Sequence, residues 1–366
     1  MTSLRVINER TTDAQMRNHL MEYGQALLEA RDLARLQLAR IAHHNIQTIR
    51  LQSHPKPQAI IAILVVRNEA HRLLDCLRHH REIGVDRFAI IDNGSSDETI
   101  DLLVDQPDVD FYSTTAPYAE SRNGSFWRSW LLKRYGYARW YLTIDADELL
   151  VYADMDRHDL HDLGAFLRSW SAKMFFAPMI DMYSNRPLNE LTYRSGDKQT
   201  DACPFFDGDS YRARRTKHWI VGLEGGPRAR LFGSKALLNK HPFFYWDRTG
   251  QRPNGHEYRT FGSRPAPSGA LLHFKFLPDL NDKISYAIES RAYYNEGAEY
   301  RSYRDGLRRS LSISYEGSRK YYGPESLVAA KLMQKIHWGS KRPTRSLLVS
   351  ALSSRSLWSS IELADR

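Results

Sequence analysis

Three carboxylates, Asp145, Asp147 and Glu148, stand within four positions at the end of an apolar segment. The segment, residues 140–144, is rich in aromatic and β-favouring residues, which is typical of a buried strand. Ligands of open α/β sheets bind where the strands end. Because alternate residues of an extended chain point the same way, we expect Asp145 and Asp147 to face one ligand together. Such a pair suits Mg²⁺ or Mn²⁺ with phosphate oxygens and water as further ligands, although a solvated acidic strand end has the same pattern.

Two more polar clusters follow predicted strands. Residues 67–69 (Arg-Asn-Glu) follow the apolar run 59–66, and residues 92–97 (Asp-Asn-Gly-Ser-Ser-Asp) end the run 87–92. In a parallel sheet the carboxyl ends of neighbouring strands share one edge, so the three clusters should meet. The chain contains neither a G-x-G-x-x-G fingerprint nor a G-x-x-x-x-G-K-S/T phosphate loop. The sequence therefore predicts a nucleotide that is held through carboxylates and a metal ion.

The elements that must position these clusters alternate between strand and helix up to residue 150. This alternation predicts an α/β fold with a right-handed, mostly parallel sheet flanked by helices. Beyond residue 150 the alternation weakens, and residues 183–269 are rich in Gly, Pro, Arg and aromatics, which predicts long functional loops. The predicted strands cover 59–66, 87–92, 109–112, the segment from 139, 173–180 and 270–277, and the predicted helices cover 69–83, 97–103, 118–135, 163–170 and 279–296.

The two ends of the chain differ from its middle. Apolar residues recur at steps of three and four along residues 11–50, which predicts a long helix with one apolar seam. The seam allows packing on the main domain or pairing with a second copy of the chain, and its alanines favour packing. Residues from 325 on are predicted to be helical and basic. We divide the chain into an N-terminal extension (1–57), a main domain of two halves (58–150 and 151–300) and a basic tail (301–366).

Charge and composition restrict the class of protein. Lys and Arg number 52 against 43 Asp and Glu, and the net charge of +9 suits a nucleotide, a nucleic acid or an acidic membrane surface. The basic residues are dispersed and no recognition motif is visible, so we expect no nucleic-acid partner. Two cysteines without paired spacing indicate neither a disulfide framework nor a zinc site. With no apolar run of membrane length and no signal segment, we expect a cytoplasmic protein whose tail can contact the inner membrane face.

Motifs that follow one another along the chain resemble the glycosyltransferase family 2-like enzymes of the GT-A fold. The resemblance is to the bacterial subgroup whose pattern is N-E, H-x-x-x-G-V-D, D-N-x-S-x-D and D-A-D-E, and it covers roughly residues 59–300. The matching residues are Asn68-Glu69, His79 or His80 before Gly84-Val85-Asp86, residues 92–97, residues 145–148, and two later segments, 225–232 and 271–276.

The resemblance implies a GT-A fold and the transfer of a sugar from a nucleoside-diphosphate sugar, with UDP-sugars favoured. The acceptor would be the hydroxyl of a saccharide or glycolipid, and the reaction would invert the sugar carbon with Mn²⁺ or Mg²⁺ as cofactor. A histidine ligand favours Mn²⁺. The residues implied in nucleotide binding are Val66, Arg67, Asn68, Glu69, Asp92, Asn93, Asp145 and Ala146.

The remaining roles implied by the resemblance fall on later residues. The metal ligands would be Asp145, Asp147 and His273, although His273 between Leu272 and Phe274 is also typical of a core histidine. Arg228, Arg230 and Lys275 would neutralise the diphosphate, unless the arginines belong to a solvated loop. Inversion needs a carboxylate base on the acceptor hydroxyl. Glu224, before Gly225-Gly226, is the first candidate for that base, and Asp181 and Asp207 are the alternatives.

Two other functions deserve comparison. A haloacid-dehalogenase-like phosphatase also carries a D-x-D after a strand, but on its first strand and with Thr or Val two residues after the second Asp. Here three predicted strands come first, and Leu149 stands at that place. A non-catalytic protein that binds nucleotides or anionic surfaces would explain the net charge, but not the three carboxylate-rich strand ends.

Overall fold

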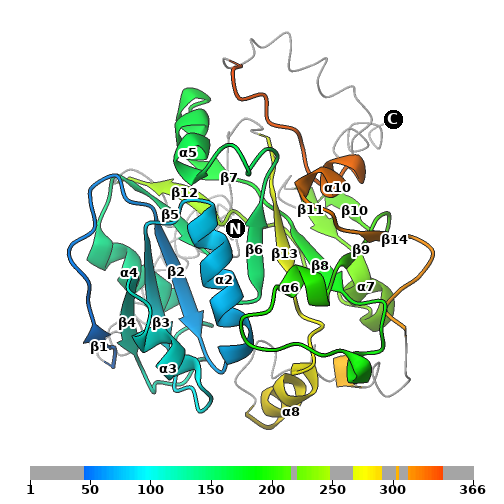
Figure 1. Ribbon diagram of the computed structural model, residues 1–366, viewed down its shortest axis with the longest axis horizontal. Coiled ribbons are helices and arrows are strands. Elements are labelled where there is room, and N and C mark those ends of the chain that lie inside the picture. The colour runs from blue at the N-terminus through cyan, green and yellow to red at the C-terminus, as the bar shows by residue number, and fades with distance from the viewer. Residues whose placement is uncertain (1–44, 216–220, 248–266, 291–301, 305–311, 341–366) are drawn as a thin grey trace, which may run out of the picture.

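The structure is a computed structural model that describes residues 45–215, 221–247, 267–290, 302–304 and 312–340. Its larger sheet has seven strands in the order β1-β4-β3-β2-β5-β12-β7 within the described residues (Figure 1). Strands β4, β3, β2 and β5 are parallel neighbours, whereas β1 and β12 run antiparallel to the strands beside them. This arrangement confirms the predicted α/β class. The strands are β1 (Gln47–Arg50), β2 (Ile61–Val66), β3 (Arg87–Asp92), β4 (Val109–Ser113), β5 (Arg139–Thr143), β7 (Met174–Phe175) and β12 (Phe243–Trp246).

Both faces of this sheet are buried, which explains why β2 is an uninterrupted apolar run. Its alternate residues Ala62 and Leu64 belong to one core cluster with Leu73 and Leu77 of α2 (Ala70–Glu82). The residues between them, Ile61 and Ile63, belong to a second cluster with Trp127 and Leu131 of α4 (Ser125–Tyr135). The period-two alternation of the strand therefore fixes α2 and α4 on opposite faces.

A second sheet of five strands has the order β14-β9-β8-β13-β6 within the described residues. Strand β13 pairs with β8 in parallel and with β6 in an antiparallel manner, so that His273 stands opposite both Asp181 and Glu148. The chain passes from the first sheet to the second through the four residues between β5 and β6. These strands are β6 (Glu148–Val151), β8 (Met179–Tyr183), β9 (Phe205–Asp207), β13 (Ala270–His273) and β14 (Ser318–Lys320).

The other elements are short and surround the two sheets (Figure 1). A hairpin of β10 (Arg212–Arg215) and β11 (Val221–Glu224) precedes α7 (Gly226–Phe232). The remaining helices are α3 (Thr99–Val104), α5 (Leu160–Ser169), the 3-10 helix η1 (Leu188–Glu190), α6 (Gln199–Ala202), α8 (Leu280–Ser290) and α10 (Pro324–Ala329).

Both predicted terminal helices need correction. The prediction for 11–50 is wrong at its end, because Gln47–Arg50 forms the edge strand β1. There the Arg50 guanidinium donates to the carbonyls of Leu103, Val104 and Gln106 at the end of α3, which favours the extended chain. Residues 1–44 lie outside the described residues. In the tail, helix α10 ends at Ala329, and residues 341–366 are likewise outside the described part, so the domain limits stay a prediction.

Three predicted elements in the middle of the chain are shorter than expected. The helix predicted for 118–135 begins at Ser125, because Arg122, Asn123 and Gly124 all have positive φ angles. The strand predicted for 173–180 divides into β7 and β8, and the strand predicted for 270–277 ends at His273.

No helix in the described ranges combines the length and the apolar character needed to cross a membrane.

The double-sided burial of the first sheet predicts the cost of a cavity in it. Leu142 of β5 is fully buried in the first core cluster, so Leu142→Ala should lower the free energy of unfolding by about 2–5 kcal/mol. Leu237→Ala is the matched control, because Leu237 is 46% exposed, and it should change stability by less than about 0.5 kcal/mol. Urea denaturation measures both, and equal losses would contradict the described core.

Candidate functional site

The first two polar clusters meet at the carboxyl ends of β2 and β3, as predicted. The Ser96 amide donates to the Asn68 side-chain oxygen at 2.8 Å, and the Asn68 amide donates to the Ser95 hydroxyl at 2.9 Å. Asn68 adopts the left-handed conformation, with φ of 53°, which is accessible to asparagine and lets its amide and side chain reach the same loop. The two strand ends therefore form one hydrogen-bonded rim.

The side chains of Asp92 and Asn93 support this rim through hydrogen bonds. The buried Asp92 carboxylate accepts hydrogen bonds from the Gly94 and Ser95 amides and from the Ser95 hydroxyl, which is a local turn typical of aspartate. The Asn93 amide group donates to the carbonyls of Thr114 and Ala116 at 3.1 and 2.9 Å. Their predicted contact with a nucleotide stays a prediction, and their observed role is to hold the turn.

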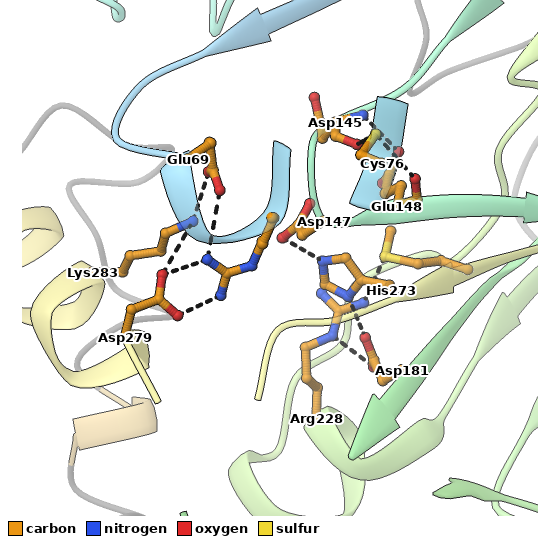
Figure 2. A network of polar contacts seen from close by, with 12 residues as sticks. Glu69, Cys76, Asp145, Asp147, Glu148, Asp181, Arg228, His273, Asp279 and Lys283 are labelled. Atoms are coloured by element: carbon orange, nitrogen blue, oxygen red, sulfur yellow. Dashed lines mark hydrogen bonds and ion pairs between the residues drawn. The ribbon is translucent and has the colours of Figure 1, made fainter. Parts of the chain in front are cut away.

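The two aspartates of the D-x-D have different protein partners in the structure, and their shared contact with one ligand stays a prediction. Residues 144–147 form a turn instead of continuing the strand, so the alternation of an extended chain does not apply. The Asp145 carboxylate accepts a hydrogen bond from the Arg128 guanidinium at 2.6 Å, with the Lys240 ammonium at 3.8 Å. The Asp147 carboxylate instead lies 3.4 Å from Nε2 of His273 (Figure 2).

Sequence reasoning missed Arg128 and Lys240, two buried cations beside the D-x-D. Lys240 forms an ion pair with the buried Glu148, whose carboxylate also accepts the Asp145 amide at 3.1 Å. Arg128 has room because a Cβ on Gly124 would lie 2.8 Å from its guanidinium. A Gly four residues before an Arg was the only available signal, and it is a weak one.

His273 forms the centre of a buried polar chain that runs from α7 through β8 and β13 to the turn before β6. Its Nδ1 lies 2.6 Å from an Asp181 oxygen, and the other Asp181 oxygen accepts from the Arg228 guanidinium at 2.8 Å (Figure 2). Burial disfavours every charge in this chain, but the ionic neighbours prevail. The carboxylates raise the pKa of His273, while His273 holds the pKa of Asp147 well below its usual range. The Arg228 guanidinium, with His273, likewise lowers the pKa of Asp181.

This geometry suits a divalent metal at one end of the chain. A carboxylate on Nδ1 of a histidine orients the ring and leaves Nε2 as the metal ligand, an arrangement found at many metal sites. Nε2 of His273 already faces the ionised Asp147, so these two residues fit the coordination of Mn²⁺ or Mg²⁺. Within the described residues no group of three or more His, Cys, Asp or Glu side chains could hold a metal.

The candidate catalytic bases occupy different surroundings. Asp207 is fully buried and accepts hydrogen bonds from Tyr183, Ser210 and Arg230. Glu224 ends β11, lies 3.7 Å from the Arg212 guanidinium and is mostly buried.

Gly225 and Gly226 hold the chain after Glu224 close to the centre of the site. Their φ angles of 126° and 76° are accessible to glycine, and a Cβ on Gly225 would lie 2.3 Å from the Ser210 carbonyl oxygen. A Cβ on Gly226 would lie 3.4 Å from Asp181, so this loop approaches the polar chain closely.

The residues predicted to bind diphosphate differ in whether a buried carboxylate already pairs with them. Arg228 and Arg230 are committed to the buried carboxylates of Asp181 and Asp207, respectively. Lys275 is half-buried, with its ammonium 5.9 Å from the ring centre of Tyr303, and its charge also contributes to the lowered pKa of Asp147.

The remaining predicted nucleotide contacts lie on the same rim. Val66 and Ala146 are buried, and Arg67 is exposed. Glu69 lies at the start of α2, where burial raises the pKa of its carboxyl group against the opposing charges of Lys283 and Arg72.

No family model matches the chain, and no curated protein matches it. One similar solved structure is glucosyl-3-phosphoglycerate synthase from Mycobacterium tuberculosis in complex with Mn²⁺, uridine-diphosphate and phosphoglyceric acid, at 17% identity and a TM-score of 0.23, over 37% of this chain and 46% of that chain. A putative glucose-1-phosphate thymidylyltransferase from Bacillus anthracis in complex with sucrose matches at 9% identity and a TM-score of 0.28, over 77% of this chain and 98% of that chain. A 4-diphosphocytidyl-2C-methyl-D-erythritol synthase matches at 12% identity and a TM-score of 0.25, over 38% of this chain and 70% of that chain. Similarity at this level does not establish an activity.

Removing only the cation of the Arg228–Asp181 ion pair should destabilise the fold. In Arg228→Met the buried Asp181 carboxylate loses its arginine, so we expect the free energy of unfolding to fall by about 3–5 kcal/mol at neutral pH. Because the folded-state pKa of Asp181 is lowered, this contribution is present above the ordinary aspartate pKa of about 3.9 and is lost as the pH falls below it. The deficit of the variant should therefore shrink in acid.

Arg212→Met is the matched control for that experiment. Arg212 is 77% exposed and 3.7 Å from Glu224, so its removal should cost less than about 1 kcal/mol at any pH. Urea denaturation of both variants from about pH 7 to about pH 2.5, below the ordinary aspartate pKa, provides the comparison. A loss for Arg228→Met that matches the control, or one that grows in acid, would contradict the described pairing.

Proposed function

We propose that the protein is a metal-dependent glycosyltransferase that moves a sugar from a nucleoside-diphosphate sugar to a hydroxyl group of a saccharide or glycolipid. The observation that carries the proposal is the Asp181–His273–Asp147 chain, which presents an oriented imidazole and an ionised carboxylate beside the β2–β3 rim. A metal held there would lie next to the place where a nucleotide diphosphate must end. A UDP-sugar is the favoured donor, in keeping with the family resemblance.

The donor would lie along the rim from β2 to β6. Its base and ribose would contact Asn68 and Glu69 and the turn that Asp92 holds, and its diphosphate would reach the D-x-D. Asp147 and His273 would hold Mn²⁺ or Mg²⁺, which supplies charge stabilisation to the departing diphosphate when bound. Arg128 and Lys240 keep Asp145 fixed at the sheet crossing, so Asp145 would orient the donor instead of holding the metal.

Two sequence-based roles change in this proposal. Arg228 and Arg230 already serve Asp181 and Asp207, so we assign them to the support of the site and leave Lys275 as a diphosphate contact. Asp181 is fully buried and bound on both oxygens, so it positions His273 and does not take a proton from the acceptor. Glu224 remains the candidate base, because the Gly225-Gly226 loop brings it near the same polar chain.

A thermal-melting series tests the proposal as a whole. UDP, GDP, CDP and ADP are each added with and without Mn²⁺ to the wild type, Asp147→Asn and the control Asp156→Asn, whose side chain is 76% exposed. A nucleotide at about 100 times its dissociation constant should stabilise the folded state by about 2.7 kcal/mol. We expect one nucleotide to stabilise wild type and control only with Mn²⁺, and Asp147→Asn to lose the effect.

The same series can refute the proposal in two ways. If no nucleotide shifts the wild-type melting temperature, the chain has no donor site and the glycosyltransferase assignment fails. If Asp147→Asn responds like the wild type, the metal is not held where we place it.

One pair of variants distinguishes the positioning role assigned to Asp181 from the role of base assigned to Glu224. Asp181→Asn replaces the carboxylate that orients His273 with a neutral amide, so UDP binding with Mn²⁺ should weaken by about 10- to 100-fold. Glu224→Gln should bind UDP with Mn²⁺ as the wild type does but release UDP from UDP-hexose donors about 10²–10⁴ times more slowly. Calorimetry and nucleotide release measure the two effects. Equal loss of binding in both variants would show that Glu224 is not the base but part of the donor site.

A further inference from the structure

Helix α8 makes three polar contacts with the strand end that is predicted to bind the nucleotide. All three residues on the rim side belong to the stretch 67–72, at the end of β2 and the start of α2, and two of them were predicted nucleotide contacts. Arg67 lies over the Tyr286 ring at 4.8 Å. Glu69 accepts from the Lys283 ammonium at 2.6 Å, and Arg72 makes a two-point pair with Asp279, the residue before α8, at 2.6 Å for the longer bond. Figure 2 shows Glu69, Lys283 and Asp279 together.

The opposite side of α8 is anchored in the second half of the molecule. Leu280 and Ile284 are buried in a third hydrophobic cluster with Tyr183 of β8 and Phe276. The helix also follows β13, the strand that carries His273, after a short connection. Through α8, the predicted nucleotide contact Glu69 and the predicted metal ligand His273 are therefore joined by a short, packed stretch of chain.

The charges in this network are arranged so that one cation can leave while each carboxylate keeps another cation nearby. Arg72 is 1% exposed and bound at two points to Asp279, whereas Lys283 is 24% exposed. When the Lys283 ammonium moves away, Asp279 keeps its arginine, and Glu69 still has the Arg72 guanidinium 3.6 Å away. No buried carboxylate loses its last cation, which is the condition that makes removal of one partner costly.

The position of Lys283 points to the ligand that would attract it. Its ammonium lies 2.6 Å from Glu69, a predicted nucleotide contact, and 3.8 Å from Asp279. A lysine is a compact charge on a flexible stem, which can exchange one oxygen partner for another within reach. A diphosphate that follows the nucleoside from the β2–β3 rim toward Asp147 would start beside this ammonium.

We propose that Lys283 is a diphosphate-binding residue that the free protein stores on Glu69. When the donor binds, the ammonium passes from the Glu69 carboxylate to a phosphate oxygen, and Glu69 becomes available to the ribose or base. The exchange couples the nucleoside part of the site to the diphosphate part, because Glu69 is released from Lys283 only when phosphate is present. This inference rests on the proposed function, since it requires a nucleotide donor at this rim.

The test compares UDP, UMP and uridine on the intact protein with Mn²⁺ by calorimetry. Lys283→Met keeps the stem and removes the charge, so UDP should bind on the order of 10- to 100-fold more weakly, as expected for the loss of one charge-assisted hydrogen bond. Uridine has no phosphate to lose the lysine contact, and in Lys283→Met it does not compete with a lysine for Glu69. Its affinity for this variant should therefore equal or exceed its affinity for the wild type. Lys283→Arg keeps the charge and should bind UDP within a few-fold of the wild type.

Lys320→Met is the matched control, because it removes one positive charge from β14 and should leave all three affinities unchanged. If Lys283→Met binds UDP like the wild type, or loses UDP and uridine by the same factor, Lys283 only supports Glu69 and the inference is wrong. If the wild type itself binds neither UDP nor UMP while its melting is cooperative, the proposed donor site fails first and the inference fails with it. The two failures are thus distinguishable by the wild-type titration alone.

Discussion

A buried histidine between two carboxylates is the interaction on which the arrangement of the site depends. His273 stands on β13 between β8 and β6 of the second sheet, with Asp181 on one side of its ring and Asp147 on the other. Charges without partners are very costly away from water, so each member of this chain requires the others. Arg228 completes it on the far side of Asp181. The D-x-D, the β8–β13 pair and helix α7 are consequently held in one mutual position.

Much of the fold could be read from periodicity, because the buried parallel strands have a strong local signal. The apolar runs that became β2 and β3 were found at nearly their observed limits, and their polar ends do meet at one rim. The prediction was weaker wherever a long-range contact decides the local structure. Gln47–Arg50 is a strand because Arg50 finds carbonyls more than fifty residues away, which no local pattern can show.

In the candidate site, too, some residues could be predicted from the sequence while their long-range contacts could not. Asp147 and His273 were chosen by residue type and family resemblance, and the structure places them together. The pairing of Asp145 with Arg128, and that of Glu148 with Lys240, joins residues whose side-chain charges are visible in the sequence but whose proximity is not. Asp145 and Asp147 have different protein partners, because the chain turns where the prediction assumed an extended backbone.

The turn between β5 and β6 also restricts how the two sheets can move. Thr143 belongs to the first sheet and Glu148 to the second, so only five peptide steps connect them. A chain of that length spans at most about 17 Å, which keeps the sheets together at this point. A second short connection ties the sheets as closely, because Phe175 ends β7 of the first sheet and Met179 begins β8 of the second. The chain therefore fixes the two sheets to one another at two points.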